Sequence, residues 1–207
     1  MHIRPKVSLW KYWGNDVLHR ILGVLFGLVM VYCPANADSA HEAFYTQFKG
    51  LCGKAFSGSV VKDDQADPRF GGKHIILHVR DCSDTEIRMP MHVGDDHSRT
   101  FILRLMGEGL EFRHDHRHED GSPDAVTLYG GVTIAAGSSD RQDFPADDKT
   151  KVLFVSNGLD VSVNNVWTIS IIPNQTVTYA LNRPNREFAI SFDLTKEVQN
   201  PPAAWGY

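Results

Sequence analysis

Three histidines at alternating positions are the part of this sequence with the clearest chemical potential. His114, His116 and His118 follow Leu110 and Phe112 at intervals of two residues. A period of two is the period of a β-strand, in which alternate side chains point to the same face of the sheet. The sequence therefore predicts a strand with two apolar side chains and then three imidazoles on one face. If the apolar side chains face a core, the imidazoles also point inward, toward one end of the fold.

The opposite face of the same strand carries only charged side chains. Glu111, Arg113, Asp115 and Arg117 alternate with the apolar residues and the histidines. Charged side chains are rarely buried in proteins unless they are paired. We therefore expect this face of the strand to be in contact with water.

Metal binding is one chemistry that alternating histidines suggest. Neutral imidazole is a common ligand of zinc and copper. Side chains two residues apart on a strand lie roughly 6–7 Å apart, so His114 with His116, or His116 with His118, could hold one divalent ion. All three on one ion is harder, because the first and third are about 13 Å apart. A complete site therefore needs a further ligand, for which the candidates are His78, His92, His97, Glu119 and Asp120.

Acid–base catalysis is a second chemistry, since His116 beside an inward-facing Phe112 could have a shifted pKa. The sequence contains no G-x-S-x-G elbow, no phosphate-binding G-x-x-x-x-G-K-[ST] loop and no G-x-G-x-x-G after a strand. No nucleophile is therefore identified. An enzymatic role stays uncertain, and the sequence favours a protein that is not an enzyme.

Binding of a small molecule is the leading hypothesis. A barrel with histidines at its mouth could hold an apolar or aromatic ligand with a polar head, or a haem held by histidine. Its wall would include Phe112, His114, His116, His118 and two aromatic residues of later strands, Trp167 and Tyr179. The alternative is that large side chains fill the interior and leave a structural or interaction module without a site. Those side chains are Phe101, Phe188, Phe192, Met89 and Met91 in addition to Trp167 and Tyr179.

The elements that must position these residues are mostly strands. Alternation predicts strands near residues 55–61, 73–79, 86–93, 99–105, 110–118, 126–134, 167–171, 177–181 and 188–194. Helical spacing predicts two short helices, at residues 39–49 and 147–157. Within the sixth strand, Gly130 and Gly131 indicate a bulge or a close backbone approach. Tight turns between the strands favour an all-β, antiparallel up-and-down barrel, with a β-sandwich as the alternative.

The first 37 residues have the pattern of a cleaved signal peptide. Four basic residues and an apolar run over residues 21–31 precede the cleavage signal at residues 34–38. The apolar run is shorter than the roughly 20 residues of a membrane-spanning helix. We therefore expect cleavage after Ala37, no lasting membrane anchor, a single barrel domain over residues 38–207 and a periplasmic or secreted location. A lipid anchor at Cys33 and an uncleaved leader are the alternatives.

Charge and cysteine content agree with this expectation. The whole chain has 21 basic and 25 acidic residues, and without a leader of four basic and one acidic residue the net charge becomes −7. A mildly acidic domain without a basic cluster argues against nucleic acid as a partner. The sequence does not specify an oligomeric state. Cys52 and Cys82 remain as an even pair, which predicts a disulfide in an oxidising compartment, with a reactive or metal-binding thiol as the alternative.

Two resemblances follow from these features. Residues 51–54, 78–87 and 114–121 resemble segments of exported bacterial proteins that have no assigned activity. The predicted architecture also resembles the lipocalin-type barrels, which bind small apolar ligands. The first resemblance implies export, and the second implies a ligand cavity inside the barrel.

Overall fold

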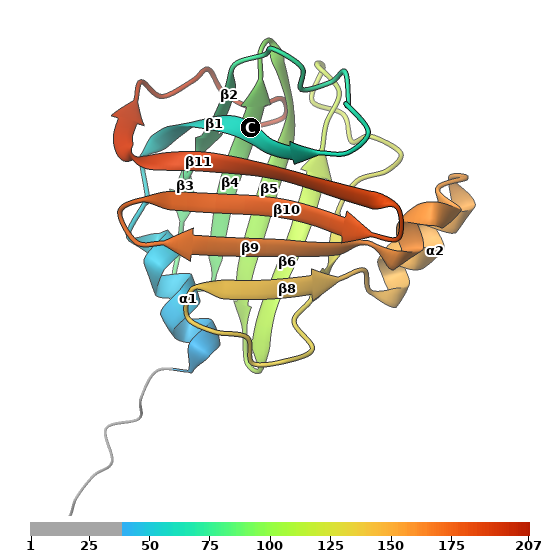
Figure 1. Cartoon of the computed structure of the whole chain (residues 1–207), viewed down its shortest axis with the longest axis horizontal. Helices are drawn as coiled ribbons and strands as arrows, with labels where there is room; N and C mark the ends of the chain where they lie inside the picture. The colour runs from blue at the N-terminus through green and yellow to red at the C-terminus, as the bar shows by residue number, and fades with distance from the viewer. Residues whose placement is uncertain (1–38) are drawn as a thin grey trace, which may run out of the picture. The chain divides into compact units, whose positions relative to one another are not determined.

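The computed structural model describes residues 39–207, and its main feature is a nearly closed antiparallel barrel of ten strands (Figure 1). The strands follow the order β8-β9-β10-β11-β1-β2-β4-β5-β6-β7, and β3 pairs only with β4. Each barrel strand therefore lies next to its neighbour in the chain, except where β11 pairs with β1. The predicted all-β barrel with two short helices is confirmed, and the sandwich alternative is not the fold. The strands are β1 (Ala55–Asp63), β2 (Ile75–His78), β3 (Asp81–Cys82), β4 (Glu86–Val93), β5 (Asp96–Met106), β6 (Gly109–His116), β7 (Tyr129–Val132), β8 (Arg141–Pro145), β9 (Val166–Ile172), β10 (Thr176–Arg183) and β11 (Arg186–Val198).

The barrel closes at a seam between β7 and β8. An isolated bridge joins Gly131 to Ala146, and the Asp147 amide donates to the Gly130 carbonyl at 3.2 Å. A Cβ atom on Gly131 would lie 1.8 Å from the Pro145 carbonyl oxygen, so only glycine permits this approach. The close backbone contact expected at these glycines is therefore present.

Strand β8 was not expected from the sequence. Its five residues include only one large apolar side chain, Phe144, which is buried beside Gln142. A short strand with a single apolar residue gives almost no alternating signal. Pairing with β9, which supplies Trp167 opposite Phe144, decides its conformation.

Helices occupy the two ends of the barrel. Helix α1 (Ala40–Lys49) begins at the capping box formed by Ser39 and Glu42, and its buried side chains include Phe44 and Phe48. Helix α2 (Asp148–Ser156) begins at Asp147 and is followed by the short 3-10 helix η1 (Asp160–Asn164). Figure 1 shows α1 and α2 at opposite ends of the front strands. Both predicted helices are confirmed, and η1 is an additional element.

The outer face of β6 is largely buried, so the expectation that it contacts water is wrong. Arg113 is only 8% exposed and Asp115 only 1%. Arg113 donates to the carboxylate of Asp147 at 2.5 Å, at the start of α2. Asp115 accepts from Thr127 Oγ1 at 2.8 Å and from the hydroxyl of Tyr207. Helix α2 and the C-terminal segment therefore cover this face, and paired charges make the burial tolerable.

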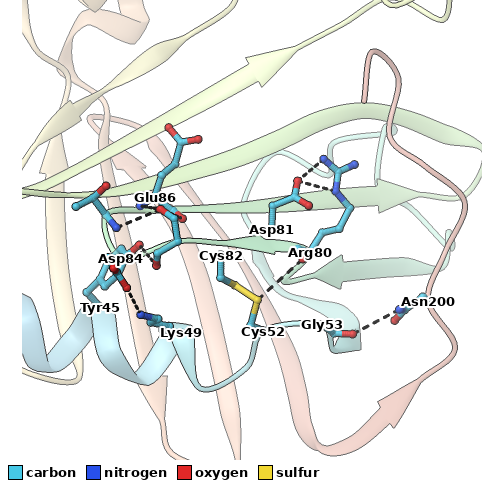
Figure 2. Close-up of a disulfide and its surroundings, with 12 residues drawn as sticks. Tyr45, Lys49, Cys52, Gly53, Arg80, Asp81, Cys82, Asp84, Glu86 and Asn200 are labelled. Carbon is cyan, nitrogen blue, oxygen red and sulfur yellow. Dashed lines mark hydrogen bonds and ion pairs between the residues drawn. A yellow bond between two sulfur atoms is a disulfide. The ribbon is translucent and has the colours of Figure 1, made fainter.

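A disulfide ties the segment after α1 to the strand β3. Cys52 and Cys82 are bonded across a sequence separation of 30, which confirms the predicted pair (Figure 2). Nearby, Lys49 at the end of α1 forms an ion pair with Asp84 at 2.7 Å. The bond and the ion pair both fix α1 against the turn that precedes β4.

The predicted signal peptide, residues 1–37, lies outside the described residues. Within residues 39–207, neither helix has the length and apolar character that a membrane crossing requires. All described strands belong to one sheet, and the extent of the domain over residues 38–207 stays a prediction.

Candidate functional site

A cavity of about 540 Å³ lies at the end of the barrel that carries α2 and η1. Its walls come from strands β4, β5, β6, β7, β9, β10 and β11, together with residues 65–70, α2 and η1. The volume is within the range of roughly 300–1,000 Å³ found for small-molecule sites. The predicted site residues that line it are His114, His116, Trp167 and Tyr179.

His114 forms the buried inner wall of the cavity and is 2% exposed. Its Nε2 atom lies 3.0 Å from the Tyr179 hydroxyl, and its Nδ1 atom lies 3.3 Å from the Tyr129 carbonyl oxygen. A carbonyl oxygen only accepts, so Nδ1 carries the proton and Nε2 accepts from the Tyr179 hydroxyl. Burial lowers the pKa of His114 well below its usual value, so the ring is neutral. Both nitrogens are therefore occupied.

The ring of Tyr129 connects the two cavity histidines. It stacks on His114 with ring centres 4.6 Å apart, and its hydroxyl lies 3.0 Å from Nε2 of His116. Burial, helped by the positive charge of Arg99, lowers the pKa of His116 to about 4. Burial also raises the pKa of Tyr129 to about 12. At neutral pH this wall of the cavity is therefore polar and aromatic but uncharged.

Phe112 and His118 do not line the cavity. Phe112 is fully buried and packs between Phe101 and Phe144, each with a ring-centre distance of 5.3 Å, so it belongs to the core below the site. His118 is exposed because β6 ends at His116 and the chain then enters the turn that contains Gly121. The alternation therefore places two of the three histidines in one site.

The structure does not assemble a metal centre from the predicted histidines. No group of three His, Cys, Asp or Glu side chains within residues 39–207 is placed to hold a metal ion. His92, named as a further ligand, lies on the outer side of β4 with its Nδ1 atom 2.5 Å from Nδ1 of His97. Burial lowers the pKa of His92 to about 4. Trp205 of the C-terminal segment packs against His97, so this pair lies under a cover away from the cavity.

Four arginines also line the cavity, and sequence reasoning missed them. Arg69 lies in the loop after β1, whereas the other three belong to strands. Arg99 is two residues from Phe101, Arg183 is two residues from Leu181, and Arg186 is two residues from Phe188. The alternation that predicted inward histidines therefore also predicts inward arginines at these positions. The general preference of arginine for the surface concealed this signal.

Comparison with protein-family models, curated proteins and solved structures finds no match for this chain. The resemblances to exported bacterial proteins and to lipocalin-type barrels stay predictions.

Proposed function

We propose that the protein binds a small, partly aromatic molecule in the cavity at the α2 end of the barrel. The observation that carries the proposal is a cavity of about 540 Å³ whose walls combine aromatic rings with a few oriented polar groups. Sites for small molecules typically combine apolar surface with a small number of polar groups that fix the ligand's orientation.

The aromatic walls supply the contact surface for such a ligand. The rings of Phe101 and Tyr179 stack with centres 4.8 Å apart, and the ring centres of Trp167 and His114 are 4.9 Å apart. Large rings with restricted side-chain freedom give much contact area and favour flat ligands. Tyr129 and Tyr179 are held in place before a ligand arrives, because each forms a hydrogen bond to a cavity histidine.

The ionisation states favour binding over acid–base chemistry. His114 has no nitrogen left to accept a proton without breaking its contact with Tyr179. His116, with a pKa of about 4, is neutral and has little basicity at neutral pH. The hydroxyl oxygens of Tyr129 and Tyr179 keep free lone pairs, so this wall can accept hydrogen bonds from a ligand.

We also propose that the protein works in the periplasm or outside the cell. The Cys52–Cys82 bond supports this location, because disulfides persist mainly in oxidising compartments. The signal-peptide pattern of residues 1–37 leads to the same location.

Titration with the neutral fluorescent dye phenylnaphthylamine tests the proposed cavity. The purified protein should bind the dye saturably, with one dye per chain. Val126→Trp should obstruct the cavity wall and weaken this binding at least about tenfold, which corresponds to about 1.4 kcal/mol. Val61→Trp is the matched control, because Val61 is 60% exposed and lies outside the cavity.

Thermal unfolding of each variant shows whether the barrel is intact. If Val126→Trp is misfolded, Ser162→Trp on the η1 wall provides a second obstruction. Absence of saturable binding, or equal binding by the obstructed variant and the control, would refute the proposal.

A further inference from the structure

Arg183 differs from the other charged groups around the cavity. It is half-buried at the end of β10, and its Nε atom is enclosed without a hydrogen-bond acceptor. Tyr179, Leu181 and Arg183 alternate on the inner face of this strand and all line the cavity. Along the strand, the ring of Tyr179 contacts His114, the apolar side chain of Leu181 follows, and the cation of Arg183 stands at the end of the strand.

The remaining cavity arginines are already neutralised by carboxylates. Arg183, in contrast to these three, has no carboxylate oxygen of residues 39–207 within 4.0 Å of its guanidinium nitrogens. The three ion pairs are Arg69–Asp67 at 2.5 Å, Arg99–Asp96 at 2.7 Å and Arg186–Asp63 at 2.5 Å.

A guanidinium group stays protonated in proteins and carries five donors in a planar fork. This fork matches the oxygens of a carboxylate, sulfonate or phosphate, which form shorter and stronger hydrogen bonds than neutral acceptors. The Nε atom itself is enclosed, so a ligand oxygen would bind the terminal Nη groups of the fork, which form no hydrogen bond within residues 39–207. The environment of Arg183 therefore has the properties of an anion site that the protein itself does not fill.

We propose that the ligand is an aromatic or amphiphilic anion whose acidic head binds Arg183 and whose body lies against Tyr179 and Trp167. This inference rests on the proposed function of the cavity. Tyr179 and Arg183 are four residues apart on a strand, so such a ligand spans about 13 Å. A molecule of two or three rings with one acidic group has this length.

The carboxylates of the cavity limit the ligand to one acidic end. Asp67 is paired with Arg69, whereas Asp124 accepts from the backbone amide of Val126 at 2.7 Å and forms no ion pair within residues 39–207. Asp124 lies on the side of the cavity that holds His116. A second negative group at that side would meet this carboxylate and be repelled.

Two dyes with the same aromatic rings distinguish the contribution of the acidic group to binding from that of the aromatic walls. Anilinonaphthalene sulfonate carries an acidic head, whereas phenylnaphthylamine lacks it. Arg183→Gln should weaken sulfonate-dye binding by about 10- to 100-fold, the typical value of a hydrogen bond to a charged group. Binding of the neutral dye should change less than about threefold, because its contacts are with the rings. Arg141→Gln is the control, because Arg141 is an exposed arginine outside the cavity.

Each outcome has a distinct meaning. Failure of both dyes to bind the wild-type protein would overturn the proposed function and this inference together. Saturable binding of both dyes with no effect of Arg183→Gln on the sulfonate dye would overturn the inference about Arg183 alone. Arg183→Lys adds a further readout: it keeps the charge but loses the fork, and intermediate affinity for the sulfonate dye is expected.

Discussion

Acid should destabilise this barrel through histidines that the fold keeps neutral, and the half-buried His116 gives the clearest test. Its pKa is about 4 in the folded protein and near 6.5 in an unfolded chain. Between these values the unfolded chain binds a proton that the folded protein excludes. The stability contribution is therefore fully present above pH 6.5 and is lost as the pH falls toward 4.

The size of the effect follows from the same two values. Lowering the pH from 7 to 5 should remove about 2 kcal/mol of unfolding free energy through His116 alone. His92 and His114, whose pKa values are also lowered by burial, act in the same direction. Glu86 and Glu111, whose pKa values are lowered because their arginine partners outweigh the effect of burial, lose their stabilising contribution mainly below this window, since a free glutamate has a pKa near 4.3.

Urea unfolding followed by circular dichroism at pH 7 and pH 5 measures the loss. In His116→Gln the loss should be smaller than in the wild type by about 2 kcal/mol, because the titrating ring is gone. His118→Gln, on the exposed segment after the same strand, is the matched control and should keep the wild-type loss. An equal loss in His116→Gln and wild type would refute the assignment of a neutral His116 ring in the folded protein.

Three further predictions concern the frame around the cavity. Replacing Cys52 and Cys82 by alanine should lower the unfolding free energy by about 3–4 kcal/mol, measured by urea unfolding without reductant. Gly131→Ala should open the seam of the barrel and destabilise it by at least about 1–3 kcal/mol, whereas Gly71→Ala, with open space around it, should be tolerated in the same thermal melts. Tyr207→Phe should lower the free energy of unfolding in urea by about 1.5–3 kcal/mol, because the hydroxyl of Tyr207 donates to the buried carboxylate of Asp115. A stability equal to wild type would contradict that contact.

Alternation alone was sufficient to predict most of the inner surface. It placed His114, Tyr179 and Trp167 inside a barrel, and the structure puts all three on the cavity wall. The same rule applied to Arg99 and Arg183 would have placed them there too. The rule fails where a strand ends, because a side chain such as that of His118 is then no longer held to one face.

The covering of the outer face could not be predicted in this way. Arg113 and Asp115 read as solvent-facing charges because their covers come from distant parts of the chain. One cover is the start of α2, more than thirty residues later, and the other is the C-terminal Tyr207. No local pattern around β6 indicates which distant segment will pack against it, so tertiary contacts decide the burial.

Burial of both faces of β6 also fixes which side chains of this strand face the cavity. A slip of one residue in a strand moves every side chain to the other face. In β6 such a slip would place Arg113 and Asp115 inside the barrel, without the partners that now neutralise them, and would move His114 away from Tyr179. A buried charge without a partner is strongly destabilising, so the ion pairs on the outer face fix the register of the strand. The position of the imidazoles in the cavity therefore depends on the charged residues behind them as much as on the aromatic rings in front.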